Sequence, residues 1–133
     1  MNKILFAFAL IFTLAFWATP VFAQELTITS DKDVVPPVAT FSGRAPSADA
    51  VVYLIVNPLE TPQQFWVQSR AAVDARKNWF GSAHLGDPGP AHAGQKFAVW
   101  AVAGPSVSLR VGEVLADLPP ARWTSKPVLV TRK

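Results

Sequence analysis

The sequence contains no cysteine, and its charged residues form no cluster. Without cysteine, a disulfide framework, a thiolate metal site and a thiol nucleophile are all excluded. The 12 Lys and Arg and the 9 Asp and Glu are spread along the chain and give a formal net charge of +3. A nucleic-acid-binding domain gathers its basic residues in a stripe or patch. We therefore do not expect nucleic acid as a partner.

The familiar catalytic and cofactor motifs are missing too. The sequence has no G-x-S-x-G, no H-E-x-x-H and no glycine-rich phosphate-binding loop. Ser82 lies just before His84, but no recognisable third member completes a hydrolase triad. His84, Asp87 and His92 share one short segment, yet their spacing matches no zinc or copper motif. We expect a protein that is not an enzyme and that needs neither a cofactor nor a metal.

The first informative feature of the sequence is an apolar N-terminal segment. Lys3 precedes an almost unbroken apolar run over residues 4–18, and the small residues Val21 and Ala23 follow it. A basic start, a short apolar core and small residues before a cut are typical of a secretory signal peptide. The run is shorter than the roughly 20 apolar residues of a membrane-spanning helix.

We therefore predict a signal-peptide helix over residues 1–23 and one domain over residues 24–133. A domain of this size buries a core without disulfides. Its predicted location is outside the cytoplasm, in the periplasm or the extracellular medium. Retention of residues 1–23 as an uncleaved membrane anchor is the alternative, and it is the one way in which we expect contact with a membrane.

The rest of the chain reads as short strands separated by proline and glycine. The runs are rich in Val, Ile, Phe, Trp and Thr, with no alternation of strands and helices, which indicates an all-β antiparallel sandwich of about seven or eight strands. Residues 50–57 are apolar on both faces, which predicts a central strand. Residues 112–123 read as partly helical, up to Pro119 and Pro120. The predicted strands are residues 25–30, 38–43, 50–57, 64–69, 78–86, 96–103, 106–111 and 126–132.

Alternation within these runs predicts the core between the two sheets. In a strand, every second side chain points to the same face. Trp79 and Leu85 share one face of their run, and Phe97 and Val99 share one face of theirs. The predicted inter-sheet layer consists of Val52, Leu54, Val56, Trp79, Leu85, Phe97 and Val99.

The order of short motifs along the chain adds a resemblance. They are ITS, PPVATFSGRA, VVYLIVNP, FWVQ, NWFGSAHLG, AGQKFAVWAVA and SKPVLVTR. This order, which covers most of residues 26–132, resembles that of bacterial exported immunoglobulin-like modules. The chain departs from the pattern at Asn78 and in the longer, proline-rich segment 87–95. The resemblance implies an immunoglobulin-like sandwich over residues 24–133, and its motifs are structural rather than functional.

Aromatic residues supply the candidate binding site. Trp66 shares a strand face with Gln64 and Gln68, and Trp100 lies on the opposite face of its strand from Phe97. Aromatic rings beside amides form sugar-binding platforms through stacking and hydrogen bonds. The same pattern also occurs on ordinary outer faces of sandwiches.

Two functions follow from these observations. The first is a non-catalytic exported domain that acts in protein–protein contact or as a structural component of the cell envelope. The alternative is a carbohydrate- or peptidoglycan-binding module. The expected partner is accordingly a protein or a cell-wall polymer. The candidate ligand-binding residues of the alternative are Tyr53, Trp66, Gln68 and Trp100.

Overall fold

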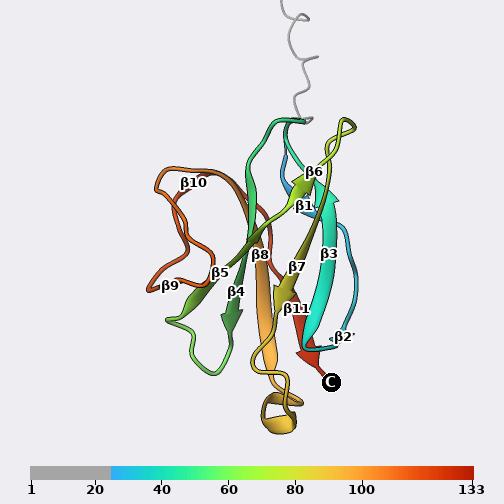
Figure 1. The fold of residues 1–133 in the computed structure, drawn as a ribbon, viewed down its shortest axis with the longest axis vertical. Coiled ribbons are helices and arrows are strands. Elements are labelled where there is room, and N and C mark those ends of the chain that lie inside the picture. The colour runs from blue at the N-terminus through green and yellow to red at the C-terminus, as the bar shows by residue number, and fades with distance from the viewer. Residues whose placement is uncertain (1–24) are drawn as a thin grey trace, which may run out of the picture.

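The computed structural model describes residues 25–133, which fold into two packed β-sheets (Figure 1). The prediction of an all-β fold is confirmed. The predicted signal peptide, residues 1–23, lies outside the described residues. Within residues 25–133, no helix is long and apolar enough to cross a membrane.

The first sheet has four strands in the order β1-β3-β7-β6, and all neighbours are antiparallel. The longest pairing joins β3 to β7 and runs from Val38 opposite His84 to Arg44 opposite Asn78. The strands of this sheet are β1 (Thr27–Ile28), β3 (Val38–Arg44), β6 (Ala72–Val73) and β7 (Asn78–His84).

The second sheet has seven strands, six of them in the order β2-β11-β8-β4-β5-β9, with β10 paired to β8. The prediction of purely antiparallel strands is wrong at one edge, where β2 and β11 run parallel. The strands of this sheet are β2 (Val34–Val35), β4 (Val52–Pro58), β5 (Phe65–Arg70), β8 (Lys96–Pro105), β9 (Val114–Leu115), β10 (Ala121–Thr124) and β11 (Val128–Arg132).

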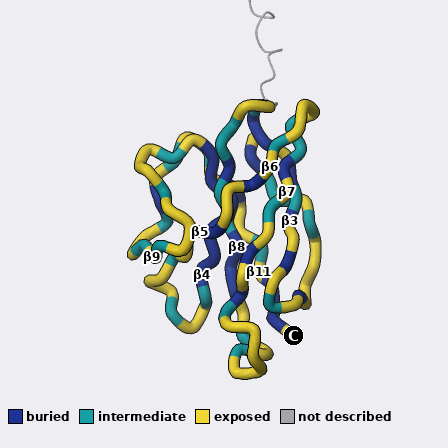
Figure 2. The backbone as a smooth tube through the Cα atoms, in the orientation of Figure 1, coloured by how far each residue is buried: buried dark blue, intermediate teal, exposed yellow. Residues whose placement is uncertain are grey.

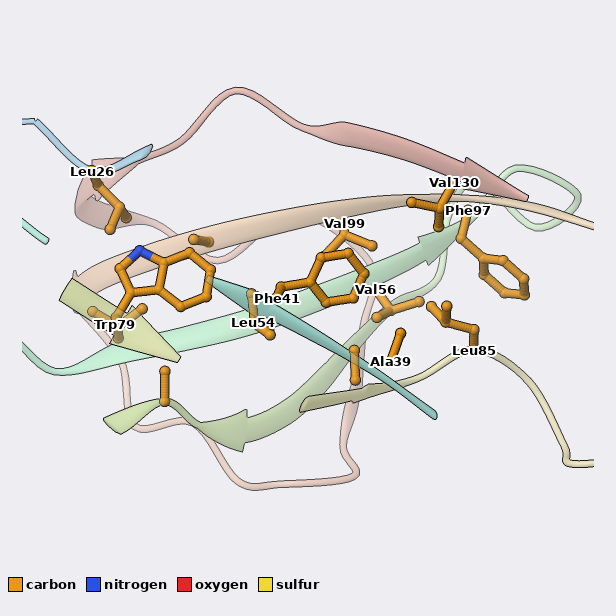
Figure 3. Close-up of a cluster of buried hydrophobic side chains, with 14 of the residues drawn as sticks. Leu26, Ala39, Phe41, Leu54, Val56, Trp79, Leu85, Phe97, Val99 and Val130 are labelled. Atoms are coloured by element: carbon orange, nitrogen blue, oxygen red, sulfur yellow. The ribbon is translucent and has the colours of Figure 1, made fainter. Parts of the chain in front are cut away.

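The main core lies between the two sheets, as the alternation predicts. All seven residues of the predicted inter-sheet layer are buried there. Trp79 and Phe41 from the first sheet meet Leu54 and Val99 from the second (Figure 3). Burial of such large side chains stabilises a sandwich of this size by several kcal/mol for each ring.

A glycine in β3 allows Trp79 to reach its buried position. A Cβ atom on Gly43 would lie 1.8 Å from the Thr27 carbonyl oxygen and 2.8 Å from Trp79 Cε2. Only glycine therefore fits between β1 and the indole ring. The indole nitrogen donates a hydrogen bond to the Thr27 carbonyl, at 3.0 Å. This contact fastens the short edge strand β1 to the core.

A second, smaller core covers the outer face of the second sheet. It centres on Ile55, Val67 and Val102, and the chain between β8 and β11 packs over them. Figure 2 shows the resulting burial of β4 and β8 in the middle of the molecule. The apolar side chains on both faces of β4 and β8 are therefore mostly buried. This confirms the prediction of a central strand at residues 50–57.

Two predictions for this covering segment are wrong. Residues 106–111 form no strand, and residues 112–123 contain β9 and the start of β10 in place of helix. Strands β4, β10 and β11 already pair with β8, so β8 offers residues 106–111 no free edge for backbone hydrogen bonds. Val114–Leu115 pair instead with the edge of β5, and this long-range pairing overrides the local helical pattern.

Candidate ligand groove

A groove opens between β5 and β7, where the two sheets separate. β6 pairs only with Trp79 and Phe80 of β7, so the chain crosses from β5 to the first sheet near that end. Figure 1 shows β5 and β7 diverging below this crossing. The cavity between them has a volume of about 630 Å³. This volume falls within the range of small-molecule sites, about 300–1,000 Å³.

Apolar side chains line part of the groove. Val56 and Phe97, two residues of the main core, reach its surface, and Val111 contributes from the segment before β9. Trp66 on β5 adds an indole ring that is 37% exposed. The groove therefore offers a ligand both an apolar surface and one accessible aromatic ring.

A neighbouring glutamine holds the Trp66 indole. The indole nitrogen donates a hydrogen bond to Gln64 Oε1, at 3.3 Å. The backbone of Trp66 is fixed as well, because Trp66 lies opposite Val114 in the pairing of β5 with β9. Since Gln64 accepts through its carbonyl oxygen, its amide NH₂ group is left as a donor beside the ring.

Gln68 has a different role from the one expected of a platform residue. Its side chain is buried, and its Oε1 accepts a hydrogen bond from the His84 backbone N–H at 2.9 Å. Its Nε2 donates to the Trp66 carbonyl at 3.4 Å. Both ends of the amide are therefore used within the protein. Gln68 joins β5 to the edge of β7 and forms a fixed wall of the groove.

The loop between β7 and β8, residues 85–95, forms the opposite wall. It contains a short 3₁₀ helix, Pro90–His92. His92 Nδ1 lies 3.0 Å from Gln95 Oε1, and His92 Nε2 lies 3.7 Å from Asp87 Oδ2. Gly86, at φ +80°, makes room for the imidazole, because a Cβ there would lie 2.8 Å from His92 Cγ.

A buried arginine anchors this loop from below. Arg132 at the end of β11 is 2% exposed and donates to the carbonyl oxygens of Leu85, Asp87, Pro88 and Gly89. A guanidinium group carries five N–H donors in a rigid plane, which suits a ring of carbonyls. Arg132 therefore sets the position of the wall that carries Asp87.

The four candidate residues named from the sequence fall into two separate places. Trp66 and Gln68 line the groove. Tyr53 and Trp100 pack into the smaller core on the outer face of the second sheet. The Trp100 indole nitrogen is buried there and has no hydrogen-bond partner within residues 25–133. The structure thus brings Trp66 and Gln68 together and keeps Tyr53 and Trp100 apart from them.

The charged side chains that line the groove are acidic. Glu60 and Asp87 line it from its two sides, and within residues 25–133 no Lys or Arg is among the lining residues. His84 and His92 also line it and add positive charge only when protonated. In the part of the chain that the structure describes, no three His, Asp or Glu side chains are grouped as a metal site would need.

The sequence places Gln64 beside Trp66 but does not show that Glu60, Asp87 and Gln95 lie at the same site. The available signal was the proline-rich segment 87–95, the point at which the chain departs from the module pattern that it resembles. Long loops on a rigid scaffold often carry function. No protein-family model matches the sequence, and no curated protein matches it either.

Proposed function

We propose that the chain is a non-catalytic, exported domain with an immunoglobulin-like topology that acts through binding. The strand order supports the topology. Immunoglobulin domains place strands A, B, E and D on one sheet and C, F and G on the other. Here β1, β3, β7 and β6 have the first arrangement, and β4, β8 and β11 have the second. β5 then corresponds to the additional strand beside C in variable-type domains.

Export is supported by the sequence of the N-terminal segment alone. Val21 and Ala23 are small residues at the positions that signal peptidase reads before Gln24. Mass spectrometry of the protein from its native host should show a chain that begins at Gln24. A protein that retains Met1 would contradict cleavage and favour the anchored form.

The first binding mode is contact with another protein, in the cell envelope or outside it. The outer face of the first sheet supports this mode, because Val38 and Phe80 are 51% and 50% exposed there. Phe80 pairs with Ser42 on β3 and presents an aromatic ring to solvent on a face that also carries Thr40, Ser42 and Ser82. Aromatic residues are enriched at protein interfaces.

A photo-crosslinking residue at position 80 tests this mode. In envelope extracts, a discrete crosslinked species is expected from position 80. The same probe at Val107, which is 47% exposed between β8 and β9 and does not line the groove, serves as the matched control. Equal crosslinking from both positions, or none from either, would contradict a specific contact at the first sheet.

The second binding mode is recognition of a carbohydrate in the groove. One observation favours it: the accessible Trp66 ring stands beside a cavity and is held by an amide. Retention of the protein on insoluble glycans tests it. Trp66→Ala should then weaken binding by about 1–3 kcal/mol, the size of one aromatic anchor. Failure of the wild-type protein to bind any glycan would leave protein contact as the surviving mode.

A further inference from the structure

The composition of the groove restricts what it accepts, if the carbohydrate mode of the proposed function holds. The chain as a whole is basic, with a formal net charge of +3 and a pI of about 9.6. The groove has the opposite character, since Glu60 and Asp87 line it and Lys and Arg do not within residues 25–133. The local charge therefore differs in sign from that of the molecule.

Carboxylates discriminate between neutral and acidic sugars. The hydroxyl groups of a neutral sugar donate strong, charge-assisted hydrogen bonds to carboxylate oxygens. A uronic acid or the lactyl and peptide carboxylates of peptidoglycan would instead place negative charge beside Glu60 and Asp87. Like charges brought together at an interface disfavour binding.

The remaining side chains complete a site for an uncharged sugar. The Trp66 ring offers an apolar face on which a pyranose ring stacks through its C–H groups. The amide NH₂ of Gln64 beside that ring and the amide of Gln95 on the opposite wall supply neutral donors. Gln68 is buried, and its Oε1 and one of its two N–H donors are already bonded within the protein, so we assign it no contact with the sugar.

We propose that the groove binds an uncharged glycan, with Trp66 as the stacking platform and Glu60 and Asp87 as hydroxyl acceptors on opposite walls. Acidic polymers, peptidoglycan among them, are excluded by the same two carboxylates. Arg132 acts as a positioning residue, because it holds the loop on which Asp87 lies.

Calorimetry on defined oligosaccharides tests this assignment. The probes are neutral hexasaccharides of glucose and of N-acetylglucosamine, an oligogalacturonate of equal length, and soluble peptidoglycan fragments. We expect the wild-type protein to bind at least one neutral hexasaccharide and neither acidic probe. Trp66→Ala and the double variant Glu60→Gln/Asp87→Asn should each weaken neutral binding about tenfold or more.

Matched controls separate loss of the site from loss of the fold. Phe80→Ala removes an exposed aromatic outside the groove, and Asp117→Asn removes an exposed carboxylate outside it. Both should bind as the wild type does. All variants should keep the melting temperature of the wild type to within a few degrees, since the groove residues that are changed are exposed.

The outcomes distinguish the assignment from the function on which it rests. If the wild type prefers an acidic probe and Trp66→Ala abolishes that binding, the carbohydrate mode stands and the uncharged ligand is wrong. If neutral binding survives in Glu60→Gln/Asp87→Asn, the two acceptors are wrong. If no probe binds to the folded protein, both the assignment and the carbohydrate mode fail, and protein contact remains.

Discussion

The Gln68 side-chain carbonyl and the His84 backbone nitrogen lie 2.9 Å apart and share a hydrogen bond that joins the two sheets. This bond occurs on the side of β7 away from β3, where within residues 25–133 β7 has no neighbouring strand at His84 because β6 pairs only with Trp79 and Phe80. A side-chain amide thus takes the place of a strand's carbonyl. It satisfies a backbone donor at the edge of the groove.

Replacing Gln68 with leucine tests the importance of this bond. The substitution leaves the His84 N–H without its partner, and we expect a loss of about 1–3 kcal/mol in the free energy of unfolding. Urea denaturation measures it. Gln63→Leu, at an exposed position nearby, is the control and should be close to neutral. Equal stability of the Gln68→Leu protein and the wild type would show that the edge needs no such support.

Trp79 is the largest fully buried side chain of the core. Trp79→Ala removes its packing and its hydrogen bond to the Thr27 carbonyl. We expect it to cost roughly 3–5 kcal/mol, a large part of the typical total of about 5–15 kcal/mol. Thermal unfolding is the measurement, with Trp66→Ala as the control for loss of an indole at an exposed position. A melting temperature for Trp79→Ala that stays near the wild-type value would contradict the assigned register of β7.

We expect that even a conservative substitution of Arg132 destabilises the protein. Lysine keeps the charge but has no planar fork, so it cannot serve several of the four loop carbonyls at once. Arg132→Lys is expected to destabilise the protein by roughly 2–4 kcal/mol, the loss of one or two hydrogen bonds to a charged donor. Arg110→Lys, at an exposed position, should change little. Similar denaturation midpoints for the two variants would refute the anchoring role.

Asp74 provides a pH-dependent contribution in the turn before β7. Backbone N–H donors of Asn78 and Arg76 bond to the carboxylate and hold the pKa of Asp74 below its usual value of 3.8. A depressed pKa in the folded state means that this contribution is present above about pH 4 and is lost as the pH falls through the folded-state value. The gap in stability between the wild type and Asp74→Asn should therefore be larger at pH 7 than at pH 3.

Urea midpoints at these two pH values measure that gap. Asp117→Asn is the reference, because Asp117 is exposed and the structure gives its carboxylate no such backbone donors within residues 25–133. A gap for Asp74→Asn that does not shrink on acidification would show that the turn does not depend on the charged form.

The alternation of apolar residues was enough to predict the inter-sheet core and the longer strands, but not the short strands β2, β6, β9 and β10. Trp79, Leu85, Phe97 and Val99 follow a period of two, and burial of one face is a local property of each strand. Gly43 is the glycine of the PPVATFSGRA motif, but the reason for a glycine there, the close approach of Thr27 to Trp79, belongs to the folded structure.

Only the tertiary structure decided which strand faces meet one another. Alternation assigns Trp66 and Trp100 each to one face of a strand, but it does not say what lies opposite that face. In the folded sheet, Trp66 lies opposite Val56, which faces the main core, and Trp100 lies opposite Ile55, which faces the smaller core, so the two rings are on opposite sides of the second sheet. The groove likewise joins residues from β5 and the 85–95 loop. Their proximity depends on sheet packing and on Arg132, which are long-range interactions that no local pattern encodes.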